Sequence, residues 1–284
     1  MIWVGGRVVS DEALTISVLD RTFEHGLGLF ETMRTWRGRA PLLARHLARL
    51  SRSARELGLP LDPSALPDDR AVSELLESEA AEGDRVLRVT LSGGLDQATC
   101  STVWMRTAPL PPPMPGDGAV VELGTWQVGS RDPLARHKSL NYWTRRIAYE
   151  SSRRAGFDEA LFMTPEGDLQ EGSRTNLFFL KDDVLITPGL VGPLVPGIMR
   201  SLVLERARAL ALRTSEVPDL RLATLAEADE IFLTNSVRGI VPVARLVVTR
   251  PSTSQQDWRA PGPWTQRLMT LLADWFERHE ESPA

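Results

Sequence analysis

The strongest constraint on the fold of this chain is a proline-rich segment near its middle. Residues 108–118 read Ala-Pro-Leu-Pro-Pro-Pro-Met-Pro-Gly-Asp-Gly. Proline lacks the backbone N–H that helices and central strands use, so this segment is expected to run as a stiff, extended connector. We therefore predict a small N-terminal domain over residues 1–108, a linker over residues 109–118 and a larger domain over residues 119–284.

Apolar periodicity predicts mixed helices and strands on the N-terminal side of this linker. The helices are expected to end where glycine or proline follows the apolar pattern. The predicted strands are 2–9, 30–36, 85–92 and 101–107, and the predicted helices are 44–57 and 69–82.

On the C-terminal side, short strands outnumber long strand–helix–strand units, which favours an antiparallel-rich α+β domain over a doubly wound parallel sheet. The predicted strands are 119–128, 159–164, 176–180, 184–186, 230–234 and 241–248, and the predicted helices are 142–155, 197–212, 222–226 and 263–279.

Composition excludes several other classes of protein. The chain has 284 residues, of which 42% are hydrophobic and 25% charged, with a net charge of -4 and a single cysteine, Cys100. One cysteine cannot form an intrachain disulfide and fits a reducing compartment. No apolar run approaches the roughly 20 residues that span a bilayer, and no secretory signal pattern opens the chain. We expect a cytoplasmic protein with small-molecule partners, and neither nucleic acid nor membrane as a partner.

Lysine is scarce in this chain. Of the 33 lysines and arginines, only Lys138 and Lys181 are lysines. An amine can lose its proton and attack a carbonyl group, whereas a guanidinium cannot readily do so. Lys181 precedes two aspartates at the expected tip of a hairpin, where it should stay charged and solvated. Lys138 is therefore the candidate nucleophile, with a simple solvated charge as the alternative.

Three other segments could complete a site around this amine. Glu171 is expected near the end of a strand, although it could equally be a turn residue. Gly197 leads into a predicted helix, whose N-terminus presents unpaired N–H groups suited to phosphate. Asn235 and Ser236 follow the strand 230–234 and offer polar groups to the same anion.

The helix 44–57 contributes a further positive charge. His46 and Arg49 are three residues apart and share a helix face. Arg49 could contribute to an anion site, or it could belong to an exposed basic face together with Arg45, Arg52 and Arg55. An amine, a carboxylate, a helix N-terminus, a polar strand end and an arginine are together the parts needed to hold a phosphorylated pyridine aldehyde.

These segments, in the order in which they occur along the chain, resemble those of the class IV aminotransferase family, the fold-type IV pyridoxal phosphate enzymes. The family includes branched-chain and D-amino-acid aminotransferases and 4-amino-4-deoxychorismate lyases. The resemblance covers nearly the whole chain and implies an α+β fold with a small N-terminal α/β sandwich domain and a larger C-terminal pseudo-barrel domain. The similar segments are 26–34, 46–50, 138–142, 171–176, 196–200 and 234–236.

The resemblance also implies pyridoxal 5'-phosphate as the cofactor and a role for each candidate residue. Lys138 would form the Schiff base, Glu171 would pair with the pyridine nitrogen, and Tyr142 would approach the phenolate. No metal ion is assigned. The resemblance further implies a homodimer, with the site between the two domains and bordered by a loop from the partner subunit. The residues implied to bind the phosphate are Arg49, Ile198 and Met199 through their backbone, Asn235 and Ser236.

The strand 85–92 supplies candidates for substrate binding. Alternation places Arg88 and Thr90 on the face opposite its leucine and valine residues. Arg88 is similar in place to the residue that binds the substrate carboxylate in branched-chain aminotransferases and to a lysine in the lyases, while a solvent-facing arginine is the alternative. Arg34 is a second candidate, for a distal carboxylate or a neighbouring loop. The predicted substrate residues are Phe30, Thr32, Arg34, Arg88 and Thr90.

The predicted reaction is transfer of an amino group between an amino acid or primary amine and a keto acid. The alternative is 4-amino-4-deoxychorismate lyase activity, which releases 4-aminobenzoate and pyruvate. Residues 92–98 lack the glycine- and arginine-rich loop common in the lyases, and Gly26-Leu27-Gly28 replaces their usual Gly-Asp-Gly. The arginine and histidine that trap carboxylate in D-amino-acid aminotransferases are also missing, so an (R)-amine donor stays open. An inactive binding homologue is disfavoured because Lys138 and Glu171 are both present.

Overall fold

The computed structural model describes residues 1–80, 82–96, 101–114, 116–249 and 253–278. Cys100 and the end of the loop 92–98 lie outside the described residues. The chain divides into two compact units. Unit 1 consists mainly of Met1–Pro111 and His137–Asn141, and unit 2 of Pro112–Arg136 and Tyr142–Glu277. The short segment that carries Lys138 therefore belongs to unit 1, although the chain on both sides of it belongs to unit 2.

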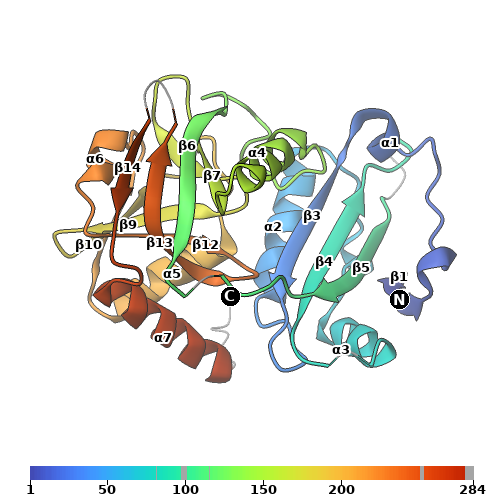
Figure 1. Cartoon of the computed structure of the whole chain (residues 1–284). Coiled ribbons are helices and arrows are strands. Elements are labelled where there is room, and N and C mark those ends of the chain that lie inside the picture. Colours follow the sequence, from blue (N-terminus) through green and yellow to red (C-terminus); the bar gives the residue numbers. More distant parts are fainter. Residues whose placement is uncertain (81, 97–100, 115, 250–252, 279–284) are drawn as a thin grey trace. The chain divides into compact units, whose positions relative to one another are not determined.

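Unit 1 is a five-stranded antiparallel sheet with helices on one face (Figure 1). Alternate residues of strand β4, including Leu87 and Val89, form one buried cluster with Leu50 and Leu75 of the helices. This arrangement confirms the predicted α/β sandwich. The sheet order is β2-β1-β5-β4-β3, with β1 Ile2–Val4, β2 Arg7–Val9, β3 Gly28–Arg34, β4 Arg85–Ser92 and β5 Val103–Pro109, and the helices are α1 Arg21–His25, α2 Leu43–Glu56 and α3 Asp69–Ser78.

The single strand predicted over residues 2–9 is wrong. Gly5 and Gly6 have φ values of +57° and +80° and reverse the chain, so β1 and β2 form a hairpin. Glycine pays no steric cost at positive φ, which is why a Gly-Gly pair makes a two-residue hairpin turn. The predicted helix 69–82 also ends early, at Ser78.

Unit 2 is built around a closed ring of strands. The ring runs β9-β12-β13-β6-β7-β8 and closes because β8 pairs with β9 as well as with β7. Leu123, Phe179 and Leu233 are among its buried core residues. This ring is the predicted pseudo-barrel, in which most strand pairs are antiparallel.

Other strands and helices complete unit 2 (Figure 1). Strands β10 and β11 extend the sheet from β9, and β14 pairs with β13. The bounds are β6 Ala119–Gln127, α4 Trp143–Arg154, β7 Glu159–Met163, β8 Leu169–Gly172, β9 Asn176–Lys181, β10 Val184–Pro188, α5 Ile198–Ala209, β11 Arg213–Val217, α6 Leu222–Ala226, β12 Glu230–Asn235, β13 Gly239–Val248, β14 Ser254–Asp257 and α7 Pro263–Arg278.

Apolar periodicity did not predict β11 or β14. Their sequences, Arg-Thr-Ser-Glu-Val and Ser-Gln-Gln-Asp, are polar because both strands lie at the margins of the sheet and have no buried residue. Among the described residues, no helix combines the length and apolar character that a membrane span requires.

Gly28 opens β3 in a backbone conformation and a space that other residues do not tolerate. Its φ is +134°, and a Cβ at this position would lie 2.6 Å from Cδ1 of Leu140 and 2.6 Å from the carbonyl oxygen of Leu91. Gly38 also has a positive φ, of +77°, but a Cβ there would meet nothing within 4 Å. Alanine substitutions at the two glycines can therefore separate the cost of backbone strain from the cost of steric overlap.

We predict that Gly28→Ala lowers the free energy of unfolding by more than about 2 kcal/mol, because strain and overlap add. Gly38→Ala should cost only about 1 kcal/mol, the strain alone. Urea unfolding followed by circular dichroism compares the two variants. Equal losses would show that the packing of Leu140 against β3 is not close.

Candidate active site

The segment that carries Lys138 pairs with the edge of the unit 1 sheet. The backbone N–H of Phe30 donates to the carbonyl oxygen of Lys138 at 2.9 Å, and the N–H of Leu140 donates to the carbonyl oxygen of Gly28 at 3.0 Å. An antiparallel bridge joins Leu29 and Ser139 between them. Because β3 is the last strand of the sheet, this pairing satisfies its outer edge and fixes the backbone of Lys138 beside Phe30.

The Phe30 ring lies next to two cations. The Lys138 amine is 4.4 Å from the ring centre, and the guanidinium carbon of Arg88 is 3.8 Å from it. Strand register places Thr32 opposite Arg88 and Phe30 opposite Thr90. The structure thus brings Lys138 together with four of the predicted substrate residues, on the face of the sheet opposite the helices.

Arg34 lies apart from this group. Its Nη2 is 2.7 Å from the carboxylate of Asp84, and its guanidinium stacks over Trp36 at 4.9 Å. Asp84 directly precedes β4, so the contact agrees with the predicted alternative in which Arg34 binds a neighbouring loop.

Arg49 and His46 share a carboxylate, that of Glu31. Arg49 donates from Nε to Oε1 of Glu31 at 2.8 Å and from Nη2 to Oε2 at 2.6 Å, while Nδ1 of His46 lies 2.6 Å from Oε2. All three side chains are buried. Glu31 was not among the residues predicted from the sequence, although a charged residue within an apolar strand pattern was a signal for it. Phosphate binding by Arg49 stays a prediction.

The pKa values in this cluster follow from burial and charge. Burial favours the neutral form of Glu31, but the charge of Arg49 and the contacts with His46 outweigh it and lower the pKa of Glu31 to about 2. Burial disfavours the imidazolium and lowers the pKa of His46, in spite of Glu31. A neutral His46 then donates its Nδ1–H to the carboxylate, which can only accept.

Glu171, which was predicted to pair with the cofactor ring nitrogen, belongs to unit 2 and is 3% exposed on β8. Its Oε1 accepts hydrogen bonds from Nη2 of Arg145 and from the backbone N–H of Val195, the latter at 3.1 Å. Its Oε2 accepts from Nδ2 of Asn176, also at 3.1 Å. Donors on both oxygens, one of them charged, favour the ionised form of this carboxylate.

Asn176 connects Glu171 to two further elements. Its Nδ2 also donates to the carbonyl oxygen of Val195 at 3.0 Å, and its backbone pairs with Thr234 of β12. A Cβ at Gly197 would overlap Oδ1 of Asn176, so a larger residue there would displace the Asn176 side chain. Asn176 therefore brings together Glu171, the start of α5 and the end of β12.

The start of α5 and the end of β12 have the chemistry of an anion site. Gly197 caps α5 without a side-chain hydrogen bond, which leaves the N–H groups of Ile198 and Met199 at an open helix N-terminus. The Thr234 hydroxyl is buried and has no hydrogen-bond partner among the described residues. Open N–H groups and a buried hydroxyl near Asn176 fit the phosphate of the expected cofactor.

Asn235 and Ser236 lie where β12 ends. Oδ1 of Asn235 accepts hydrogen bonds from the backbone N–H groups of Val237 at 3.0 Å and Arg238 at 2.8 Å, which shapes the turn that carries Ser236. Contact of these two residues with phosphate stays a prediction.

Tyr142 orders the loop that follows Glu171. Its hydroxyl donates to the carbonyl oxygen of Ser173 at 3.0 Å, and the backbone N–H of Ser173 donates to buried Glu159 at 3.1 Å. Burial raises the pKa of Tyr142 to about 12, so its hydroxyl stays protonated at neutral pH. Its approach to a cofactor phenolate stays a prediction.

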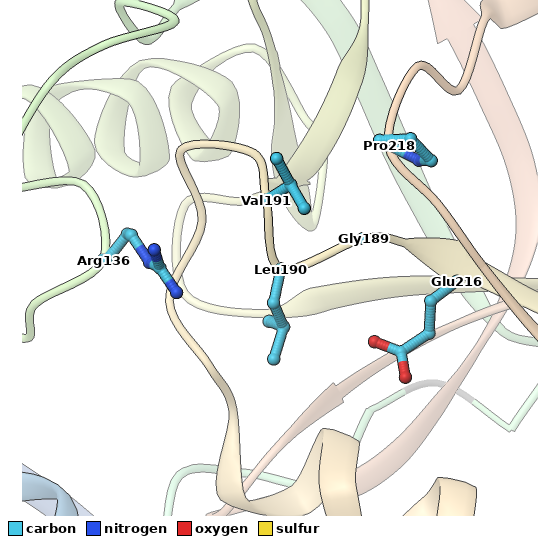
Figure 2. Close-up of a pocket in the computed structure, with 6 residues that line it drawn as sticks. All are labelled: Arg136, Gly189, Leu190, Val191, Glu216 and Pro218. Carbon is cyan, nitrogen blue, oxygen red and sulfur yellow. The ribbon is translucent and has the colours of Figure 1, made fainter.

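A surface pocket of about 490 Å³ lies elsewhere on unit 2 (Figure 2). Figure 2 shows Arg136 on one side of the pocket and Glu216 on the other. Glu216 accepts a hydrogen bond from buried Arg200 at 2.7 Å. None of the predicted site residues lines this pocket, so we do not assign it to catalysis. Its lining residues are Arg136, Gly189, Leu190, Val191, Glu216 and Pro218.

The other lysine has the surface position that the sequence predicts. Lys181 ends β9, and Asp182 and Asp183 turn the chain at φ values of +50° and +55°. Lys181 forms an exposed ion pair with Glu227.

The chain is similar to known proteins over most of its length. The family described as "Amino-transferase class IV" matches residues 28–246. A Methanocaldococcus jannaschii protein named "Putative branched-chain-amino-acid aminotransferase" is 32% identical over 253 residues, which is 85% of this chain and 86% of that protein.

Two solved structures extend the comparison. The 4-amino-4-deoxychorismate lyase from Pseudomonas aeruginosa is also 32% identical, has a TM-score of 0.78 and covers 96% of this chain and 98% of its own. A T.th. branched-chain amino acid aminotransferase, solved with pyridoxamine 5'-phosphate, has a TM-score of 0.83 at 24% identity, over 98% of this chain and 94% of its own. The last likeness shows the fold alone.

Acidification is expected to destabilise unit 1 through Glu31 and His46. Both have folded pKa values below those of the unfolded chain, 4.5 and 6.5, so the unfolded state binds more protons as the pH falls. The free energy of unfolding should decrease below pH 6.5 through His46 and below pH 4.5 through Glu31, by up to about 1.4 kcal/mol per pH unit for each proton.

Urea unfolding between pH 7.5 and pH 5 measures this slope. His46→Gln should reduce it, whereas His25→Gln, at an exposed histidine, should leave it unchanged. A slope that His46→Gln does not alter would contradict the assignment.

Proposed function

Because the chain belongs to the class IV aminotransferase family, we propose that it is a pyridoxal-phosphate-dependent transaminase. It would move an amino group between an amino acid or primary amine and a keto acid. The observation that carries the proposal is the position of the Lys138 amine beside Phe30 and Arg88. A nucleophilic amine next to a cation that can bind a carboxylate is what an amino-acid substrate requires.

We assign pyridoxal 5'-phosphate as the cofactor because residues of this chain fit each part of it. The open N-terminus of α5 and the buried Thr234 hydroxyl suit its phosphate, and the ionised Glu171 suits a protonated ring nitrogen. Lys138 supplies the amine for its aldehyde. When bound, the cofactor supplies an electron sink for the electrons left at the substrate Cα.

Each of the predicted residues would then have a separate role in the reaction. With the cofactor bound, Lys138 would act as a neutral base that accepts and returns the proton of the substrate Cα. Glu171, as a carboxylate, would favour the protonated ring nitrogen, and Arg88 would bind the carboxylate of the amino donor. Tyr142 orders the loop after Glu171 through Ser173. We also propose that the chain forms a homodimer and that it acts in the cytoplasm.

The second candidate function is 4-amino-4-deoxychorismate lyase activity. The specific observation in its favour is the 32% identity to the Pseudomonas aeruginosa lyase, which equals the identity to the aminotransferase-named relative. Both reactions would use Lys138 and Glu171, so the two functions can be distinguished only by their products. Purified holoenzyme would be given D-alanine, L-leucine or (R)-1-phenylethylamine with a keto acid acceptor, and aminodeoxychorismate alone. A newly aminated acceptor supports the transaminase, and 4-aminobenzoate without an acceptor supports the lyase.

The two lysines offer a matched test of the cofactor. Lys138→Ala should abolish the near-visible absorbance band of bound pyridoxal phosphate and all activity, because no amine remains to bind it covalently. Lys181→Ala should retain both, since Lys181 only pairs with Glu227 on the surface. Wild-type protein that cannot be loaded with the cofactor, or loss of the band in Lys181→Ala alone, would contradict the proposal.

Arg88→Ala should lower kcat/KM for amino-acid donors by roughly 10- to 100-fold, because a charged hydrogen bond to a carboxylate contributes about 1.5 to 3 kcal/mol. The loss should appear mainly in KM. Activity with (R)-1-phenylethylamine, which has no carboxylate, should change little. Arg106→Ala, at the exposed cross-strand neighbour of Arg88, is the control. An unchanged KM for amino acids in Arg88→Ala would remove Arg88 from the substrate site.

A further inference from the structure

An arginine on α4 forms a buried ion pair with the carboxylate that we assign to the ring nitrogen. Nη2 of Arg145 bonds to Oε1 of Glu171, and its Nη1 donates to the carbonyl oxygen of Gly172 at 3.3 Å. Its guanidinium also lies 5.5 Å from the ring centre of Phe162. The side chains of Arg145 and Glu171 are only 16% and 3% exposed, so the pair is largely shielded from solvent.

The neighbouring arginine shows what an ordinary pairing on this helix looks like. Arg146 pairs with Glu150 one turn further along α4, and its side chain is 62% exposed. Surface pairs of this kind contribute little to stability. Burying Arg145 disfavours its charge, but the charge of Glu171 and its hydrogen bond, together with Tyr142 and Glu159, outweigh that cost and raise the pKa of Arg145.

The need to provide hydrogen-bond donors to Glu171 does not by itself explain why an arginine lies beside it. The backbone N–H of Val195 already donates to the same oxygen, and Asn176 donates to the other. Arg145 adds a full positive charge, which neither of those donors supplies. Its effect on Glu171 is therefore mainly on the proton affinity of the carboxylate.

Resting on the proposed function, we propose that Arg145 is a positioning residue that keeps Glu171 ionised, so that the proton between Glu171 and the pyridine nitrogen stays on the nitrogen. In a buried site, a neutral carboxylic acid beside a neutral pyridine competes with the carboxylate–pyridinium pair, because burial penalises charge. A positive charge that touches the carboxylate but not the ring lowers the proton affinity of Glu171 and favours the charged pair. The protonated ring then withdraws electrons from the substrate more strongly.

Replacement of Arg145 by a neutral residue should move this proton to Glu171. The test uses full-length protein loaded with pyridoxal phosphate labelled with ¹⁵N at the ring, and its readout is the ¹⁵N chemical shift at neutral pH. Wild-type protein should show a pyridinium signal. Arg145→Met should shift it downfield, toward unprotonated pyridine, and Arg146→Met, on the same helix, should leave it unchanged.

Arg145→Gln separates charge from hydrogen bonding, because glutamine keeps a donor without the charge. It should give the same downfield shift as Arg145→Met, and it carries the test if the methionine variant does not fold. A wild-type pyridinium signal in Arg145→Gln would overturn the inference and leave Arg145 a structural tie between α4 and β8. Wild-type protein that binds no labelled cofactor would instead overturn the proposed function itself.

Discussion

The pairing of residues 138–140 with the edge of β3 is the interaction on which the rest of the site depends. It returns a short piece of chain to unit 1 from within the sequence of unit 2, and it is possible because Gly28 leaves room for Leu140. Once the backbone of Lys138 lies beside β3, strand alternation determines what its amine meets. Phe30 and Arg88 point to the same face, whereas Glu31 points to the opposite face and joins Arg49 and His46. Backbone hydrogen bonds, and not side-chain contacts, therefore determine where the Lys138 amine lies.

The second constraint is the cost of burying a carboxylate. Glu171 lies within a strand of the closed ring, and each of its oxygens must be paired. Asn176 meets part of that need and also links Glu171 to the start of α5 and the end of β12. One side chain thus holds Glu171, which we propose for the ring nitrogen of the cofactor, close to the start of α5 and the end of β12, which we propose for its phosphate. Arg145 supplies a positive charge to Glu171, which the neutral amide of Asn176 cannot.

Much of this architecture could be predicted from the sequence, because apolar periodicity reports elements that bury one face. The bounds of β4 and α6 agree with the prediction, and α2 differs by one residue at each end. Periodicity fails where burial does not shape the sequence, as in the polar strands β11 and β14. The resemblance of short segments indicated Lys138 and Glu171, and Phe30 and Arg88 were among the predicted substrate residues, but Arg145 was not predicted. Arg145 looks like any helix arginine until the fold brings β8 beside it, and the link from Asn176 to Thr234 arises only from strand register.

We propose that the chemistry of this protein begins at Lys138. Treatment of the holoenzyme with borohydride converts a cofactor–lysine linkage into a stable bond, which mass spectrometry of the digested protein can assign to a residue. We predict a pyridoxyl-phosphate group on the peptide that contains Lys138 and none on the peptide that contains Lys181. Modification confined to Lys181, or holoenzyme that carries no modification after reduction, would contradict it.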